Sequence, residues 1–527
     1  MIVVDRHGAQ GSRVHHDDRL ENVFEQRCDW IQEYGRPDLL AVDGDELSLT
    51  YNELDAWANR LARYLRLHGA GAGDRIALLF DRPADAYIGM LAVLKLGGAY
   101  VPLDLASPGD RSAYIVADAR AKIVLSRSTL REPMARSQAA ADAQLLFVDD
   151  AAPLIAELSD RRLQPAERGG HPSSTAFVVY HSDPNGRPAA VAIDHPSICN
   201  AVKVAAEVYG LRSRDRVYLD SSLSSNRAVE QLWATWASGA TVVPDAARLR
   251  GQQLHEFLSR SQISAVYGTA TQLADVPSVL PELKLVLLAG EPVPSDQVAR
   301  WHGPGRRVLG TYSPATGVVA AAWAELHPDK PVSLGLPLPS FAAVILDPNN
   351  PRRALPHGEP GEIGIAGVGL ACGYLNRDDL PEHAFVEDFL DVPGNPSKRI
   401  FRTGDLGRVN SSGEIEYLGR VDRPVRLAAD ELATPAVEDC ERAAIDSELS
   451  AVRSELERLR AEKADLLEQL RGLRPAEPRR QVGLAPTAGD WAAAGNCLDE
   501  SGTATTTPSR SVTPRPPAAA TPRWAGA

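Results

Sequence analysis

Apolar residues recur along this chain with two periods, one typical of helices and one typical of buried strands. Helical spacing begins after Arg19 and comprises Leu20, Val23, Phe24, Cys28 and Ile31. Short apolar runs at residues 39–42 and 75–80 predict strands, and residues 84–95 predict a further helix. Strands that alternate with helices indicate an α/β fold built on a parallel sheet.

The residues before Leu54 carry a helix-start signal. Thr50 is a candidate N-cap and Glu53 lies three residues later, which is the spacing of a capping box. The apolar face of the helix that follows consists of Leu54, Trp57, Ala58, Leu61, Ala62 and Leu65. We therefore expect a helix that begins immediately after Thr50.

Length and charge narrow the class of protein. A chain of 527 residues exceeds what one core usually serves, so two or more domains are expected. The formal net charge of −13 argues against nucleic acid or an anionic membrane as a general partner. The 5 cysteines show no metal-ligand spacing, and no apolar run is long enough to span a bilayer. We expect a cytoplasmic protein with no membrane or nucleic-acid partner.

A turn rich in small and polar residues joins the apolar run 176–180 to a second apolar run that begins at Val191. Its Ser182 and Gly186 are typical of a loop whose backbone N–H groups hold phosphates. Asp183 and the pair Ala189–Ala190 do not suit that task, because one adds negative charge and the others supply no cation. From this loop alone, an ordinary hairpin connection remains open beside the phosphate-binding interpretation.

Motifs spread along the chain resemble the adenylation domains of nonribosomal peptide synthetases, which belong to the adenylate-forming enzymes. The matching stretches, in order, are residues 49–54, 94–104, 361–377, 401–406 and 419–422. The resemblance covers roughly residues 20–438. It implies an α/β fold with a large N-terminal domain of layered α/β subdomains and a small β-barrel-like sheet. It also implies activation of a carboxylic acid, usually an amino acid, with Mg·ATP to an acyl-adenylate.

Several residues that the family uses at the phosphates are replaced in this chain. On the phosphate loop Ser182 and Gly186 match, whereas positions 181, 183–185 and 189–190 read His, Asp-Pro-Asn and Ala-Ala. Thr316 stands where the family has the glutamate that holds Mg²⁺, and a hydroxyl is a weak ligand for a hard cation. The resemblance therefore implies weak or partial binding of ATP or AMP, an uncertain Mg²⁺ and no catalytic or metal-binding residue that we can name.

More of the residues that the family uses to bind the nucleoside are present in this chain than of those it uses at the phosphates. The resemblance places Gly290 and Glu291 beside the adenine, Tyr312 against its ring, and Asp405 and Arg420 at the ribose. A packed core aromatic remains an equal interpretation of Tyr312, and a plain strand-linking turn remains open for Asp405 and Arg420. Asp422 matches the hinge of the family's C-terminal subdomain.

The same resemblance supplies a candidate acyl pocket. Its residues are Asn226, Leu287, Ala289, Thr311, Val319 and Ala320. Asn226 stands where the family has an aspartate for the substrate ammonium, so an acid without an α-amino group fits better. Alternatively, Asn226 caps a helix or bonds locally at its start.

The family's pattern ends after the hinge. The only lysine beyond Asp422 is Lys463, and it does not lie in the glycine loop that carries the family's catalytic lysine. In place of the C-terminal subdomain, apolar residues alternate four and three apart from Ile445 to Leu473, with Lys463 as a polar seam position. This heptad pattern favours a parallel homodimer through residues 445–473, and a single helix folded back on the domain is the alternative.

These patterns divide the chain and leave two functional hypotheses. The predicted segments are a disordered N-terminus (1–18), an adenylation-type large domain (19–420), a hinge with a remnant of the C-terminal subdomain (421–438), a coiled coil (439–474) and a disordered tail (475–527). Under the first hypothesis the chain is an impaired pseudoenzyme that binds a nucleotide or an acyl group as a dimeric partner of peptide-synthetase pathway proteins. Under the second it is an active, atypical ligase that another polypeptide completes.

Overall fold

The computed structural model describes most of the chain up to Val421. The described residues are 2–4, 18–132, 143–168, 170–182, 188–220, 223–245, 248–314, 320–339, 341–370, 373–376 and 385–421. They belong to one compact unit. The predictions for Asp422, for the coiled coil at 439–474 and for the tail at 475–527 lie outside the described residues.

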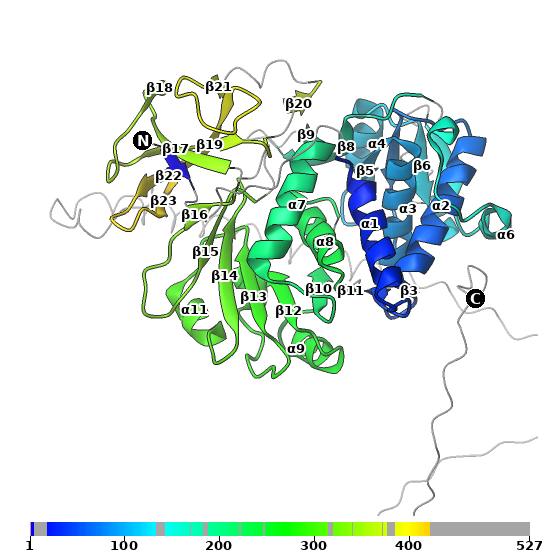
Figure 1. Cartoon of the computed structure of the whole chain (residues 1–527), viewed down its shortest axis with the longest axis horizontal. Coiled ribbons are helices and arrows are strands. Elements are labelled where there is room, and N and C mark those ends of the chain that lie inside the picture. The colour runs from blue at the N-terminus through cyan, green and yellow to red at the C-terminus, as the bar shows by residue number, and fades with distance from the viewer. Residues whose placement is uncertain are drawn as a thin grey trace, which may run out of the picture. The chain divides into compact units, whose positions relative to one another are not determined.

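In the described part of the chain, the largest sheet has nine strands (Figure 1). In spatial order they are β16 (Leu336–Pro337), β15 (Ala322–Glu325), β14 (Arg307–Tyr312), β13 (Leu285–Ala289), β12 (Ala265–Gly268), β10 (Arg216–Asp220), β11 (Thr241–Asp245), β2 (Leu40–Asp43) and β3 (Ser48–Thr50). The strands from β14 to β2 pair in parallel, and the outer strands are antiparallel. Parallel strands of this kind need covering on both faces.

A second sheet of seven described strands also contains both parallel and antiparallel pairs. Its order is β20 (Gly373–Leu375), β9 (Pro188–Asp194), β8 (Thr175–Ser182), β5 (Ala99–Pro102), β4 (Arg75–Leu78), β6 (Ile123–Ser126) and β7 (Gln144–Phe147). The strands from β8 to β7 are parallel, whereas β9 returns antiparallel to β8. The connection between β8 and β9 is the candidate phosphate loop.

The third sheet is antiparallel, and all its described strands except β1 come from the part of the chain from Phe341 onward. Its described strands are β1 (Ile2–Val4), β17 (Phe341–Asp347), β18 (Asn350–Ala354), β19 (Gly361–Gly367), β21 (Phe385–Glu387), β22 (Arg399–Val409) and β23 (Ile415–Arg420). The prediction of a disordered segment at 1–18 does not hold for Ile2–Val4, which pairs with β17. An Ile-Val-Val run has high strand propensity, and β17 offers it an edge.

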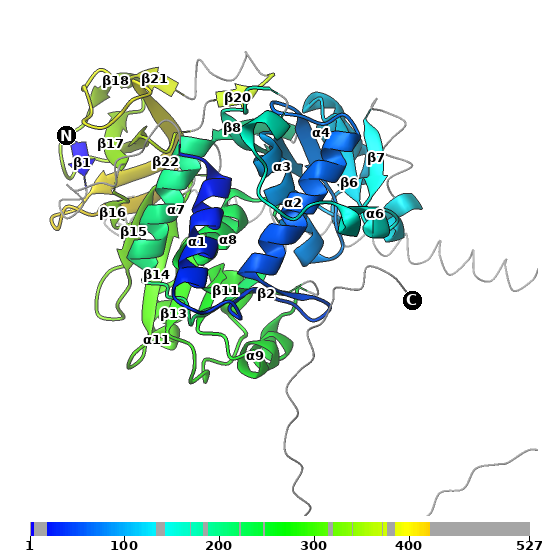
Figure 2. The same ribbon diagram turned by 45° about the vertical axis from the view of Figure 1, so that its right-hand side comes forward.

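Helices fill the space between the two large sheets and cover their outer faces (Figures 1 and 2). They are α1 (Leu20–Glu33), α2 (Tyr51–Leu67), α3 (Pro83–Leu96), α4 (Gly109–Asp118), α6 (Ala152–Glu157), α7 (His195–Tyr209), α8 (Asn226–Ser238), α9 (Gly251–Arg260), α10 (Ala270–Leu273) and α11 (Ser295–Trp301). One core cluster contains residues of α1, α2, α3, α7 and α8 together with residues of strands in both sheets. Examples are Ile76 of β4 and Val242 of β11. The helical positions that the sequence predicts after Arg19 are buried in α1, except Val23, which is half-buried.

Strand β13 shows how the sheet is covered on both faces. Leu287 and Ala289 face one cluster with residues of α7 and α8. Val286 and Leu288 face a second cluster with residues of α9 and α11. The alternation follows from the two-residue period of a strand, and it directs Leu287 and Ala289 toward the side where the candidate site lies.

The capping box predicted before Leu54 is present. The Thr50 side chain accepts from the backbone N–H of Glu53 at 3.2 Å, and the Glu53 carboxylate accepts from the Thr50 N–H at 2.9 Å.

We expect Thr50→Ala to lower the free energy of unfolding by about 1 kcal/mol. Urea denaturation measures this loss, and Thr50→Ser should recover most of it. An Ala variant as stable as the wild type would contradict a stabilising role for the cap.

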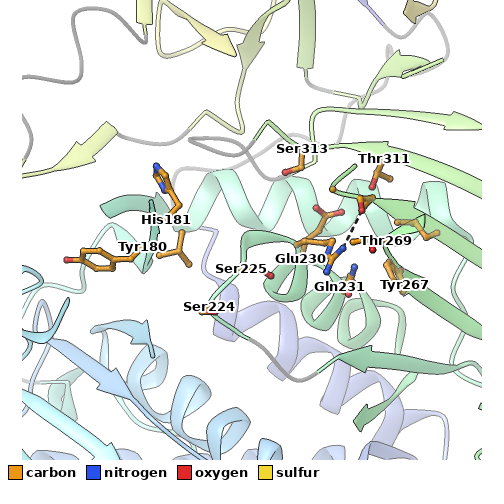
Figure 3. Close-up of a pocket in the computed structure, with 15 residues that line it drawn as sticks. Tyr180, His181, Ser224, Ser225, Glu230, Gln231, Tyr267, Thr269, Thr311 and Ser313 are labelled. Carbon is orange, nitrogen blue, oxygen red and sulfur yellow. Dashed lines mark hydrogen bonds between the residues drawn. The ribbon is translucent and has the colours of Figure 1, made fainter. Parts of the chain in front are cut away.

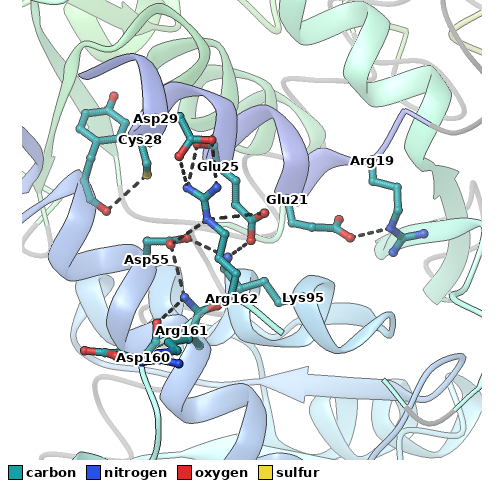
Figure 4. A network of polar contacts seen from close by, with 12 residues as sticks. Arg19, Glu21, Glu25, Cys28, Asp29, Asp55, Lys95, Asp160, Arg161 and Arg162 are labelled. Atoms are coloured by element: carbon teal, nitrogen blue, oxygen red, sulfur yellow. Dashed lines mark hydrogen bonds and ion pairs between the residues drawn. The ribbon is translucent and has the colours of Figure 1, made fainter. Parts of the chain in front are cut away.

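An ionic cluster ties α1, α2 and α3 together in the protein interior (Figure 4). Lys95 of α3 is buried and forms ion pairs with Glu25 of α1 and, at 2.7 Å, with Asp55 of α2. Arg162 reaches the same group from a loop and pairs with Asp29 at 2.7 Å. The cluster therefore fixes three helices against one another by charge as well as by apolar packing.

Candidate nucleotide and acyl site

Two adjoining cavities lie at the carboxyl ends of β13 and β14. One has a volume of about 370 Å³ and the other about 480 Å³. Gly290, Thr311 and Ser313 line both cavities, so the two meet at these residues. The carboxyl ends of parallel strands are where α/β sheets usually bind ligands.

Asp405 lies in the smaller cavity and is held from two sides. The Tyr312 hydroxyl donates to Oδ2 at 2.6 Å, and Nη1 of Arg420 donates to Oδ1 at 3.1 Å. Asp405 and Arg420 are also opposite each other in the β22–β23 pair. Burial raises the pKa of the Asp405 carboxyl above its ordinary value, although the hydrogen bond from Tyr312 and the charge of Arg420 oppose this. A carboxylate has about four acceptor positions, so ligand hydroxyls can still bind it.

The bulge in β22 that carries Asp405 requires a glycine. Gly404 has a φ of +73°, and a Cβ there would lie 2.9 Å from Nη2 of Arg420. The Gly404 N–H donates to Oε1 of Glu362 at 3.0 Å, and Arg402 forms an ion pair with the same carboxylate at 2.6 Å. The Arg-Thr-Gly-Asp sequence is therefore not a turn that links two strands but a bulge within β22, and these contacts hold the backbone before Asp405 in place.

Tyr312 is packed in a core and also lines a cavity. Its ring belongs to a core cluster with Ala322 and Phe341, and only 8% of the residue is exposed. The same residue lines the smaller cavity, with its hydroxyl held by Asp405. It is a core aromatic that also forms part of the cavity wall.

Gly290 and Glu291 follow β13 at the rim of the smaller cavity. Gly290 has a φ of +87°, a conformation that favours glycine. The Glu291 carboxylate accepts from the backbone N–H of Thr271 in the first turn of α10. Burial raises the pKa of Glu291, but the Thr271 hydrogen bonds outweigh it and hold the pKa below its ordinary value. Glu291 thus anchors the loop to α10.

The larger cavity contains the predicted acyl-pocket residues Leu287, Ala289 and Thr311 (Figure 3). The Ala320 N–H donates to Oε2 of Glu230, which lines this cavity. Val319 and the side chain of Asn226 lie outside the described residues. The N-cap of α8 is Ser225, whose Oγ accepts from Ala228 N–H at 3.2 Å, and Asn226 is the first helical residue.

Several polar residues of the larger cavity are absent from the sequence-based prediction, among them Arg227, Glu230, Gln231 and Tyr267. A helical spacing signal exists for Glu230, because it follows Asn226 by four residues and so shares its face. Tyr267 lies next to the last residue of β12 and pairs with Leu287 of β13, which only the folded sheet shows.

Comparisons with known proteins agree with this arrangement. The model of the family described as AMP-binding enzyme matches residues 30–375. The chain belongs to the AMP-binding enzyme family. Novobiocin biosynthesis protein H from Streptomyces niveus is 35% identical over 413 residues, which cover 76% of this chain and 67% of that protein. Bacitracin synthase 3 from Bacillus licheniformis is 31% identical over 407 residues, 76% of this chain but only 6% of that synthase.

Solved structures show the same fold. The nonribosomal peptide synthetase FmoA3 (S1046A) with bound alpha-methyl-L-serine-AMP has a TM-score of 0.66 and 28% identity, and the match covers 77% of this chain and 45% of that one. The N-terminal subdomain of NpsA from Klebsiella oxytoca has a TM-score of 0.65 at 20% identity, over 77% and 99% of the two chains. The predicted family and the α/β fold of the large domain are confirmed, whereas the coiled coil stays a prediction.

At the phosphate segment this AMP-binding family member has an apolar wall. Ala189 and Ala190 of β9 are each 1% exposed and lie opposite His181 and Tyr180 of β8. His181 lines the larger cavity, and Ser182 ends β8 with its side chain undescribed. Gly186 lies outside the described residues. The two positions that carry Lys-Gly in the resemblance thus contribute only buried methyl groups.

A magnesium site is not formed by the described residues of this family member. They include no group of three or more His, Cys, Asp or Glu side chains that could hold a metal ion. Glu291 is engaged by the α10 backbone, and Thr316 lies outside the described residues. Since Mg²⁺ prefers several anionic oxygens or phosphate ligands, the described protein groups do not fit it alone.

No described helix is both long and apolar enough to cross a membrane.

Proposed function

We propose that this chain is an impaired adenylation domain that binds a nucleoside and an acyl group but does not carry out efficient phosphate chemistry. It acts as a dimeric partner of peptide-synthetase pathway proteins in the cytoplasm. The family relatives supply the class of ligand: one FmoA3 (S1046A) structure holds AMPPNP and another holds an aminoacyl-AMP.

The nucleoside half of the proposed site is supported by its geometry. Asp405 would accept the two ribose hydroxyls, with Arg420 balancing its charge at 3.1 Å. Tyr312 would face the adenine, and Gly290 lets the backbone approach it without a side chain. These groups form a wall of the 370 Å³ cavity.

The loss of efficient chemistry is supported chiefly by the buried pair Ala189–Ala190. A transferring phosphoryl group needs fixed positive charge and N–H donors where negative charge develops. Two methyl groups buried in β9 supply neither. The sequence changes Asp183, Pro184 and Thr316 act in the same direction.

An active ligase completed by another polypeptide is the second candidate. It is favoured by the 480 Å³ acyl cavity, which keeps charged and polar groups that a purely structural copy would not need. The family's catalytic lysine would then come from another polypeptide. The parallel homodimer through 445–473 is compatible with either candidate.

ATP–pyrophosphate exchange by the full-length chain with Mg²⁺ tests the proposal. We expect no exchange above background with amino, hydroxy or aryl acids, while AMP binds measurably by isothermal titration calorimetry. Robust exchange by the chain alone would overturn the impaired-enzyme proposal. Exchange that starts only when a separate C-terminal subdomain is added would select the active ligase instead.

A further inference from the structure

The larger cavity is lined by charged groups of both signs, Arg227 and Glu230. At the rim it shares Gly290, Thr311 and Ser313 with the smaller cavity, so an acid that reaches both would place its carboxyl end there. Glu230 and Gln231 of α8 and Tyr267 of β12 line the same cavity (Figure 3). The chemistry of these groups defines what the far end of the acid must be.

Glu230 is a buried carboxyl without a protein cation. Only 5% of the residue is exposed, and its two oxygens accept from the Tyr209 hydroxyl at 2.6 Å and from the Ala320 N–H at 2.9 Å. Among the described residues no Lys, Arg or His forms an ion pair with it, although Arg227 lies one helical turn earlier. Burial raises the pKa of Glu230, and the two hydrogen bonds oppose that rise. A buried carboxylate in this position is costly until a cation joins it.

Two further polar atoms beside Glu230 have no partner. The Tyr267 hydroxyl and Nε2 of Gln231 are buried without a hydrogen bond, and the residues are 2% and 5% exposed. Buried polar groups are nearly always hydrogen-bonded, so unpartnered groups that line a cavity point to a ligand. The Tyr267 oxygen can accept from a donor that also reaches Glu230.

The positive charge in the cavity wall belongs to Arg227, which lies close to Gly290 at the place where the two cavities meet. Nη1 of Arg227 is 3.4 Å from the carbonyl oxygen of Ala289 and would lie 3.5 Å from a Cβ on Gly290. Its ion pair with Asp220 is long, at 4.0 Å. A guanidinium at this place favours an anionic group of the ligand and disfavours an ammonium there.

We propose that the larger cavity takes a carboxylic acid whose far end carries an ammonium group, with Glu230 as its counter-ion and Tyr267 as a second acceptor. The acid lacks an α-ammonium, because Arg227 lies beside Ala289 and Gly290, where such a group would need a carboxylate. An ω-amino acid has this distribution of charge. The inference rests on the proposed function, since it uses the acyl half of that site.

A matched series of 5′-O-(N-acylsulfamoyl)adenosines tests the inference on the full-length chain. The acyl groups are 5-aminopentanoyl, 5-hydroxypentanoyl and pentanoyl, which differ only in the terminal ammonium, hydroxyl or methyl. We expect the ammonium compound to bind about 10- to 100-fold more tightly than the methyl compound by calorimetry. Equal binding, or a preference for the methyl or hydroxyl compound, would overturn the assignment.

Variants separate a ligand contact from a structural role. Glu230→Gln should abolish the preference for the ammonium compound, whereas the exposed Glu359→Gln should leave it unchanged. Tyr267→Phe removes only an unpartnered hydroxyl and should weaken the ammonium compound about 5-fold, so it serves if Glu230→Gln does not fold. A folded Glu230→Gln chain that keeps the preference would contradict the inference.

The outcomes also distinguish this inference from the proposed function. All three compounds carry adenosine, so their common affinity reports the nucleoside half of the site. If they bind equally, the proposed function stands and the ammonium assignment fails. If none of them and no AMP binds, both fail together.

Discussion

Asp405→Asn is expected to weaken AMP binding about 100-fold or more. In the proposed site this carboxylate accepts both ribose hydroxyls while Tyr312 and Arg420 hold it in place. Hydrogen bonds to a charged group each contribute about 1.5–3 kcal/mol, so losing the charge behind two of them costs about 3 kcal/mol at least. Isothermal titration calorimetry with AMP measures the change, and the exposed Asp391→Asn should bind like the wild type.

A second ligand shows whether the ribose is the group involved. The wild type should bind 2′,3′-dideoxy-AMP about as weakly as Asp405→Asn binds AMP. The variant should no longer distinguish the two nucleotides, because neither offers it a useful contact at the ribose. If Asp405→Asn binds AMP normally and still prefers it to the dideoxy compound, Asp405 does not hold the ribose.

The elements that sequence predicts well are those with a strong local signal. The period of Leu20, Phe24 and Ile31 predicts α1, and Thr50 with Glu53 predicts the start of α2, because both signals depend on neighbouring residues only. Strand β1 is different. Its Ile-Val-Val run pairs with a strand that lies more than 300 residues away, and no local pattern announces such a partner.

The candidate site likewise contains residues that a local motif predicts and residues that only the folded structure brings together. Asp405 is recognisable from its motif, but its partner Tyr312 lies 93 residues earlier and their hydrogen bond requires the folded sheets. Glu230 belongs to no motif, and its four-residue spacing from Asn226 indicates only a shared helix face. The structure gives the missing information, since it is the packing of α8 on β10 and β11 that leaves Glu230 in the wall of the cavity.

Lys95→Met is expected to lower the free energy of unfolding by about 3 kcal/mol or more. Methionine keeps the length of the side chain but removes its charge, so Glu25 and Asp55 lose the cation that lies between α1 and α2. Removing one partner of a buried ion pair typically costs about 3–5 kcal/mol, because the remaining charge stays out of water. Arg162 lies 3.4 Å from Asp55 and compensates in part. Urea denaturation followed by circular dichroism measures the loss.

Two comparisons identify burial as the reason for this effect. Lys122 also forms an ion pair, with Asp74 at 2.9 Å, but its side chain is 47% exposed, so Lys122→Met should cost no more than about 1 kcal/mol. Adding Asp55→Asn to Lys95→Met should restore part of the stability, since it removes one of the carboxylates that lost its cation. A Lys95→Met chain as stable as the Lys122→Met chain would mean that the helices are held by their apolar contacts and that the buried charges contribute nothing net.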